Sequence, residues 1–348
     1  AAAGAYVAFP KKGLHKWIGS MDLNSLYPSV IRALNMAPET IVAQIRPEIS
    51  ESRVHEDITL KKKSFAGSWE GRFSTEEYEA VMEKRRDVSL TVDFENGDTE
   101  VVSGAELYKL IYDSNMPWML SSNGTIFTTE FEGVIPGILK RWYAERKDMQ
   151  KMLKKAKEAE NDAEIEYWDK RQLVKKINLN SLYGALLNPG CRFFDSRLGQ
   201  STTLTGRVIT KHMGAKVNEI ITGVYDHKGQ SVIYGDTDSI MIYTGSDDWE
   251  RVQQLGKEVK KAVNKKYKLL EIEIDGVFKS MLLLKKKKYA ALIASKNRKT
   301  GEIEYEKETK GLDLVRRDWC GLSKEVGLFV LDHVLSGEDR EGVVASIH

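Results

Sequence analysis

The sequence predicts an α+β fold in which a central antiparallel β-sheet is flanked by helices and carries an antiparallel two-helix hairpin. Residues 231–243 alternate apolar side chains around Gly235-Asp236-Thr237-Asp238, which indicates a tight β-hairpin. Residues 135–187 follow a helical period that is interrupted at Asn161-Asp162, which indicates two long helices. A chain of 348 residues is long enough for two or three compact domains.

The composition is typical of a soluble globular protein, with 41% apolar residues, 30% charged residues and a net charge of +2. Two cysteines, Cys191 and Cys320, are too few for a disulfide framework and predict thiols. No apolar run approaches the roughly 20 residues of a membrane span, and the start lacks the basic flank of a signal peptide. We therefore expect an intracellular protein without a membrane partner, in either the cytoplasm or the nucleus.

The elements before the helical hairpin begin with a strand over residues 14–22, which ends at Asp22. A turn or helix start follows at Ser25 to Ser29, where Pro28 suits the first turn of a helix. Residues 46–134 are interpreted as an insert that contains a hairpin around Asn96-Gly97. We assign no chemistry to this insert.

The elements after the helical hairpin begin with a helix over residues 201–222, followed by the hairpin at 231–243. A helix at 250–267 precedes strands at 269–284 and 288–294, and residues 323–348 are predicted to be helical. The apolar arms of the hairpin, at 232–234 and 240–242, predict that it forms core strands of a sheet.

Acidic residues mark the ends of the predicted core strands. Asp236 and Asp238 are two residues apart and project to one side if the strand period holds. An Asp-Thr-Asp turn is by itself ordinary turn chemistry. Here its arms are apolar, and clustered carboxylates between core strands need a counter-charge, which Mg²⁺ supplies. Asp22, at the end of another apolar strand, is the natural third member.

One face of the second long helix carries Lys176, Asn180 and Tyr183 at helical spacing. A basic stripe on paired helices is commonly a solvated surface. The pair Tyr183-Gly184 favours a different interpretation, because a glycine beside an aromatic ring permits the close approach of a flat group.

Five motifs in a fixed order resemble those of family B (alpha-like) DNA polymerases. The carriers are Asp22 to Ser29 (D-x-x-S-L-Y-P-S), Lys176 to Gly184 (K-x-x-x-N-S-x-Y-G), Tyr234 to Ser239, Lys287-Lys288-Tyr289, and Lys310-Gly311 with Arg316-Arg317-Asp318-Trp319. Residues up to about 225 are similar to T-even-type phage and bacterial members, whereas 232–319 are similar to eukaryotic DNA polymerase alpha. A mosaic gene or an engineered chimera would each produce that mixture.

The resemblance implies the domains of a polymerase hand. Residues 1–13 would be the remnant of a linker after a missing exonuclease domain. The palm would comprise 14–134, with its insert, and 191–318; the fingers would be the helical hairpin at 135–190. Residues 319–348 would begin an incomplete thumb. The exonuclease and thumb regions would be missing or supplied by a partner chain.

The resemblance also implies roles at the reaction centre. Asp22, Asp236 and Asp238, with the Leu23 carbonyl, would bind two Mg²⁺ ions, with Mn²⁺ as an alternative. The metals would support attack of a primer 3′-OH on a deoxynucleotide, with release of pyrophosphate. Lys176 would contact the phosphates and protonate the pyrophosphate. Glu271 and Glu273 resemble acidic positions near the metals, although a structural role in a strand is an equal alternative.

The remaining implied roles concern the substrates, which are deoxynucleoside triphosphates and primer–template DNA. Backbone N–H groups of Ser25, Leu26 and Tyr27 would bind the triphosphate, and the Tyr27 ring would exclude a 2′-hydroxyl. The other residues implied to bind the nucleotide are Arg146, Asn180, Tyr183 and Gly184. Those implied to contact DNA are Lys287, Tyr289, Lys310, Arg316 and Arg317. The sequence departs from the family at Gln150, where a second basic residue is common; Lys151 follows it.

Three alternatives to an active polymerase core stay open. A non-catalytic palm would keep the fold and lose the acids. A reverse transcriptase or nucleotidyl cyclase shares paired carboxylates but lacks the motif from Lys176 to Gly184. A split polymerase fragment would act only with a partner chain that carries the thumb and exonuclease.

Overall fold

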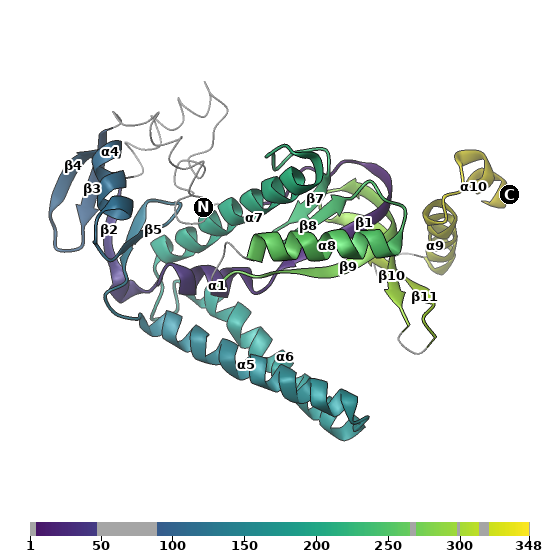
Figure 1. Cartoon of the computed structure of the whole chain (residues 1–348), viewed down its shortest axis with the longest axis horizontal. Coiled ribbons are helices and arrows are strands. Elements are labelled where there is room, and N and C mark those ends of the chain that lie inside the picture. Colours follow the sequence, from purple (N-terminus) through teal and green to yellow (C-terminus); the bar gives the residue numbers. More distant parts are fainter. Residues whose placement is uncertain (1–4, 47–88, 265–268, 298–299, 313–319, 348) are drawn as a thin grey trace. The chain divides into compact units, whose positions relative to one another are not determined.

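The computed structural model describes residues 5–46, 89–264, 269–297, 300–312 and 320–347 (Figure 1). The chain forms two compact units, and each has its own sheet. The first unit comprises Ala1–Ala5 and Ser25–Ile209, and the second comprises Tyr6–Asn24 and Thr210–His348. None of the helices in these described ranges combines the length and the hydropathy of a membrane span.

The first unit contains a five-stranded antiparallel sheet with the order β4-β3-β2-β6-β5. Its strands are β2 (Ile41–Ile45), β3 (Ser89–Phe94), β4 (Thr99–Ser103), β5 (Trp118–Leu120) and β6 (Thr125–Thr128). The hairpin predicted around Asn96-Gly97 is confirmed as the turn between β3 and β4, with Gly97 at φ 95°. Short helical segments complete the sheet region: η1 (Pro38–Thr40), α4 (Gly104–Tyr108) and η4 (Lys109–Asp113).

The helical part of the first unit is the hairpin of α5 (Val134–Glu158) and α6 (Asp162–Leu186), which lie side by side (Figure 1). The predicted break is confirmed, because the Asn161 side chain accepts a hydrogen bond from the N–H of Glu164 and caps α6. Lys175 of α6 forms an ion pair with Glu145 of α5. The helix α1 (Leu26–Ala33) contacts both long helices.

The second unit is built on a six-stranded antiparallel sheet with the order β11-β10-β9-β1-β8-β7. Its strands are β1 (Gly13–Leu23), β7 (Val232–Asp236), β8 (Ser239–Tyr243), β9 (Ile272–Lys285), β10 (Lys288–Lys296) and β11 (Ile303–Lys310). Buried side chains of β1, β7, β8, β9 and β10 form one core that includes Ile18, Tyr234 and Phe278. Ile18 is the residue of the central strand β1 that belongs to this core.

Helices cover the sheet of the second unit. The helix α8 (Trp249–Asn264) packs on β1 and β9 (Figure 1), and it approaches closely because Gly256 faces the Ile274 side chain. The helix α9 (Gly321–Leu335) buries Leu331 and Leu335 against β9 and β10. The helix α7 (Ser196–Thr222) begins in the first unit and ends in the second.

The fold class is as predicted, but individual elements differ, and the strands β2, β5 and β6 of the first unit were not predicted. The strand β11 was not predicted. The single helix predicted for 323–348 is two helices, α9 and α10 (Arg340–Ile347). Ser336 caps α9, and Gly337 adopts φ 89°, a left-handed conformation that ends the helix. Cys191 and Cys320 are free thiols, as predicted.

Candidate active site

The turn between β7 and β8 carries Asp236 and Asp238. Thr237 between them adopts φ 60°, and the N–H of Asp238 donates to the carbonyl of Asp236 at 2.7 Å. The Ser239 hydroxyl donates to the same carbonyl at 3.1 Å. These bonds close a two-residue turn, so both acids stand at the end of buried strands.

Asp22 lies beside this turn because β1 is the neighbour of β8. Asp22 pairs across the sheet with Ser239, and the N–H of the next residue, Leu23, donates to the carbonyl of Asp238 at 2.7 Å. The structure therefore brings together acids that are more than two hundred residues apart in the chain. All three line one cavity of about 600 Å³ within the second unit.

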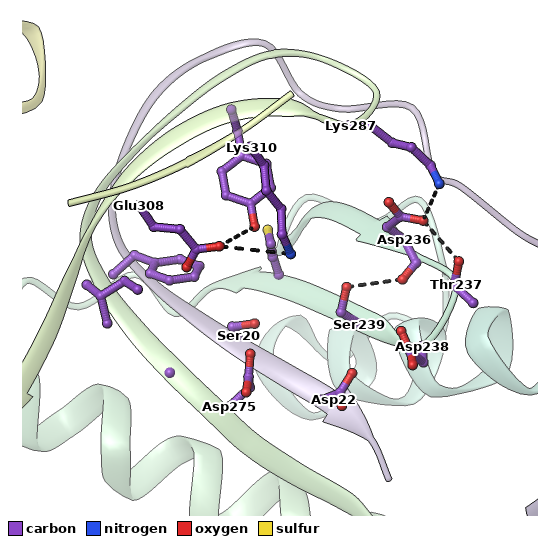
Figure 2. Close-up of a pocket in the computed structure, with 15 residues that line it drawn as sticks. Ser20, Asp22, Asp236, Thr237, Asp238, Ser239, Asp275, Lys287, Glu308 and Lys310 are labelled. Atoms are coloured by element: carbon purple, nitrogen blue, oxygen red, sulfur yellow. Dashed lines mark hydrogen bonds and ion pairs between the residues drawn. The ribbon is translucent and has the colours of Figure 1, made fainter. Parts of the chain in front are cut away.

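The two acids of the turn have different surroundings. The Asp236 carboxylate is turned toward Lys287, whose Nζ lies 3.6 Å away, and accepts a hydrogen bond from Thr237 (Figure 2). The pKa of Asp238 is raised, first by burial and also by the negative charges of Asp236 and Asp275. A buried carboxylate beside further acids gains most from a cation.

No three acidic, histidine or cysteine side chains in the described ranges are gathered closely enough to hold a metal ion. The Asp236 carboxylate points toward Lys287, and Asp22 and Asp238 lie at the strand ends below it (Figure 2). Two carboxylates on adjacent strands are hard oxygen donors and suit Mg²⁺ or Mn²⁺. The donor set fits a divalent cation, and Asp22, Asp236, Asp238 and the Leu23 carbonyl as its ligands all stay predictions.

A second wall of the cavity is basic and comes from the β9–β10 turn and β11. Lys287, at φ 59°, donates its N–H to the Tyr234 hydroxyl at 2.8 Å. Gly311 follows Lys310 at φ 62°, and a Cβ there would lie 2.0 Å from the Lys287 carbonyl oxygen. The Lys287-Lys288-Tyr289 and Lys310-Gly311 motifs are thus in direct contact, and this contact requires a glycine.

Tyr289 is buried, and its hydroxyl donates to Glu308 at 3.3 Å. Burial raises the pKa of Tyr289, and the Glu308 carboxylate raises it further. The Lys310 ammonium lies 5.8 Å from the ring centroid and 3.9 Å from Glu308. Lys310 is exposed and Tyr289 is not, so their predicted contacts with DNA would differ, and both stay predictions.

Two acids of this cavity, Asp275 and Glu308, were not predicted. Glu308 stands two residues before Lys310, so the strand period could have placed them on one face. Glu271 and Glu273 do not line the cavity, and Glu273 lies 4.0 Å from Lys260. The predicted DNA contacts Arg316 and Arg317 lie outside the described residues.

In the first unit, Tyr27 of α1 stacks on Tyr183 of α6, with ring centroids 4.6 Å apart. A Cβ on Gly206 would lie 3.0 Å from the Tyr27 ring, so this glycine makes room for the ring. Burial raises the pKa of Tyr183. Ser25 precedes α1 in a left-handed conformation (φ 51°), and the Leu26 side chain is buried. Ser25 and Leu26 would therefore bind a triphosphate mainly through their backbone groups.

The predicted nucleotide-binding residues of α6 share an exposed face. Lys176, Asn180 and Gly184 are all exposed, and a Cβ on Gly184 would meet no atom within 4 Å. On α5 the Arg146 Nε donates to Gln172 at 3.4 Å. Lys151, beside Gln150, is exposed and paired with Asp148 at 3.0 Å. The roles of these residues stay predictions.

Comparison with known proteins supports the inference from the motifs. The family model for DNA polymerase family B matches residues 1–348. The chain is 36% identical over 350 residues to the DNA polymerase alpha catalytic subunit of Sterkiella nova, covering 100% of the chain, and 35% identical over 346 residues to that of Mus musculus, covering 99%. The chain therefore belongs to DNA polymerase family B.

These relatives are much longer than the chain. It spans 20% of the Sterkiella nova protein and 19% of the Mus musculus protein. The Drosophila melanogaster DNA polymerase alpha catalytic subunit is 42% identical over 219 residues, which are 62% of the chain and 14% of that relative.

Proposed function

We propose that the chain is the catalytic core of a DNA-directed DNA polymerase, which adds deoxynucleotides to the 3′-hydroxyl of a primer. The observation that carries this proposal is the pair Asp22 and Asp238 at the ends of β1 and β8, joined by the hydrogen bond from Leu23 to Asp238. Membership of the family supports the same activity and a dependence on divalent cations.

Asp22 and Asp238, with the Leu23 carbonyl, would hold the divalent cation, and we propose Mg²⁺, with Mn²⁺ as an alternative. When bound, such an ion lowers the pKa of an attacking hydroxyl and offsets charge on phosphoryl oxygens. The chain supplies two half-buried carboxylates, one at the end of β1 and one in the turn before β8. Since the raised pKa of Asp238 reflects burial, a bound cation would favour its ionised form.

The remaining residues supply binding and orientation. Lys287 and Lys310 give the cavity a basic wall that suits the phosphate backbone of primer–template DNA. In the first unit, the N-terminus of α1 suits the triphosphate, because helical N–H groups and the helix dipole favour anions. Lys176 and Arg146 would contact the same phosphates, and Asn180, Tyr183 and Gly184 the nascent base pair.

A second candidate function is a polymerase fragment that acts only with a partner chain. It is favoured by the lengths of the relatives, of which this chain spans about a fifth. In this case the thumb and exonuclease regions would be supplied separately, and the isolated chain would bind metal and nucleotide without extending a primer.

Extension of a 5′-labelled primer on a DNA template tests the proposed function. The Asp238→Asn variant should lose at least about 100-fold in rate with Mg²⁺, because a metal ligand supplies several kcal/mol in such reactions. Asp247→Asn, which changes an exposed aspartate after β8, is the matched control and should retain the rate. Extension by Asp238→Asn at the rate of the unmodified chain would contradict the proposal; no extension by the unmodified chain would favour the fragment.

A further inference from the structure

The turn that carries Asp236 and Asp238 is held by three segments from outside its hairpin. The N–H of Thr237 donates to the carbonyl of Tyr6 at 2.8 Å, and the carbonyl of Thr237 accepts the Thr210 hydroxyl at 2.7 Å. The carbonyl of Asp238 accepts the N–H of Leu23 at 2.7 Å. The N-terminal segment, α7 and β1 therefore each bind one peptide group of the turn.

Thr237 needs such support because its backbone is strained. It adopts φ 60°, a left-handed conformation that a β-branched residue rarely takes. Strain of this kind persists only where the surroundings fix it, and both the N–H and the carbonyl of Thr237 have partners. The conformation of Thr237 sets the directions of the acids on either side of it.

The contact with α7 depends on one side-chain hydroxyl. Thr210 is 2% exposed, so its hydrogen bond to Thr237 is shielded from water. The contact with Tyr6, by contrast, uses a main-chain carbonyl and survives substitution of the side chain. A substitution of Thr210 can therefore remove one of these three contacts and leave the two main-chain contacts in place.

We propose that Thr210 is a positioning residue for the candidate metal centre: its hydroxyl fixes the Thr237 peptide and thereby the directions of the Asp236 and Asp238 carboxylates. This inference rests on the proposed function, since it assumes that the turn binds a divalent cation. Thr210 does not contact the cation itself. Its effect is exerted through the backbone of the turn.

The Thr210→Val variant keeps the shape of the side chain and removes the donor. The Thr237 carbonyl then loses a buried partner, so the turn can leave the conformation that presents both acids. Thr210→Ser restores a hydroxyl. A matched control is Thr202→Val, a buried threonine of the same helix whose hydroxyl donates to Leu198, away from the turn.

The measurement is the affinity for Mn²⁺ alone, from the amplitude of the electron paramagnetic resonance signal of free Mn²⁺ during titration. Thr210→Val should weaken the affinity about tenfold or more, as loss of groups that orient metal ligands commonly does. Thr210→Ser should restore it, and Thr202→Val should match the unmodified chain. Circular dichroism establishes that each variant is folded; if Thr210→Val is not, Thr210→Cys, a weaker donor, replaces it with the same expectation.

The outcomes separate this inference from the proposed function. If the unmodified chain binds Mn²⁺ and folded Thr210→Val binds it equally well, Thr210 has no positioning role. An equal loss in Thr202→Val would show a general effect of removing a hydroxyl from α7 and would also overturn the inference. If the unmodified chain binds no Mn²⁺, the metal centre of the proposed function is itself contradicted.

Discussion

Asp236 and Asp238 are two residues apart and meet different electrostatic surroundings. Asp236 forms an ion pair with Lys287 at 3.6 Å, whereas burial raises the pKa of Asp238. An exposed ion pair of this kind contributes little to stability. Here the ion pair affects orientation, since it directs the Asp236 carboxylate toward Lys287 and away from Asp22 and Asp238.

Tyr27 is the residue predicted to select deoxynucleotides over ribonucleotides. Its ring is fixed by the Tyr183 ring at 4.6 Å and by the close approach of Gly206. If this ring excludes a 2′-hydroxyl, Tyr27→Ala should raise the ratio of ribonucleotide to deoxynucleotide incorporation about tenfold or more, a modest difference in free energy. Primer extension with each nucleotide measures the ratio.

The control for this prediction is Tyr27→Phe, which keeps the ring and removes only the hydroxyl. It should retain the selectivity of the unmodified chain. Unchanged selectivity in Tyr27→Ala would show that the ring does not exclude the 2′-hydroxyl, and a loss in Tyr27→Phe equal to that in Tyr27→Ala would assign the effect to the hydroxyl instead.

At the scale of elements, α6 offers a test that separates stability from function. Gly184 lies inside this helix with open space beside it, so Gly184→Ala should raise the free energy of unfolding by about 1 kcal/mol through helix propensity. If a base pair packs on this glycine, the added methyl group should raise the KM for the nucleotide. Chemical denaturation and steady-state kinetics measure the two effects.

Gly184→Ala is thus expected to stabilise the fold and to weaken nucleotide binding, so the two effects can be told apart. Greater stability with an unchanged KM would show that nothing packs on Gly184, and its assignment to the nucleotide site would be wrong. A suitable control is Glu164→Ala on the same helix, which also changes an exposed residue but lies outside the motif from Lys176 to Gly184, and is expected to leave the KM unchanged.

The elements that the sequence predicted well have a strong local signal. The two long helices follow from apolar periodicity and from Asn161, which caps α6. The strand β11 lacked such a signal: residues 303–310 are mostly charged and exposed, because β11 lies at the edge of its sheet. Strand propensity does not identify an edge strand whose charges face solvent on both sides.

The residues of the site, too, were predicted where the sequence carries a local signal and missed where it does not. The strand ends and the turn predicted Asp22, Asp236 and Asp238 as neighbours, and the register of β1 against β8 confirms that Asp22 lies beside the turn. The pairing of Asp236 with Lys287 could not be predicted, since it depends on the turn between β9 and β10. The role of Thr210 could not be predicted from the sequence either, because its hydrogen-bond partner is a backbone carbonyl 27 residues away.

At the scale of the whole molecule, the chain divides at Ala5–Tyr6, at Asn24–Ser25 and at Ile209–Thr210 into two units. The candidate metal ligands belong to the second unit, and the predicted nucleotide-binding residues of α1, α5 and α6 belong to the first. The domain boundaries of palm, fingers and thumb stay predictions, as does the remnant of a linker before β1.

The relatives also bear on the predicted mixture of sequences. The DNA polymerase alpha catalytic subunits of Sterkiella nova and Mus musculus align with 100% and 99% of the chain, so their similarity is not confined to residues 232–319. The particular likeness of the first part to T-even-type phage members stays a prediction.

The central claim is that Asp22 and Asp238 together bind a divalent cation, and Mn²⁺ titration of single carboxylate variants tests it most directly. Asp22→Asn and Asp238→Asn should each abolish measurable binding, because each removes one of the two carboxylates proposed to hold the ion. Asp236→Asn should have a smaller effect, since Asp236 is turned to Lys287. Equal affinity in Asp22→Asn and the unmodified chain would contradict the account.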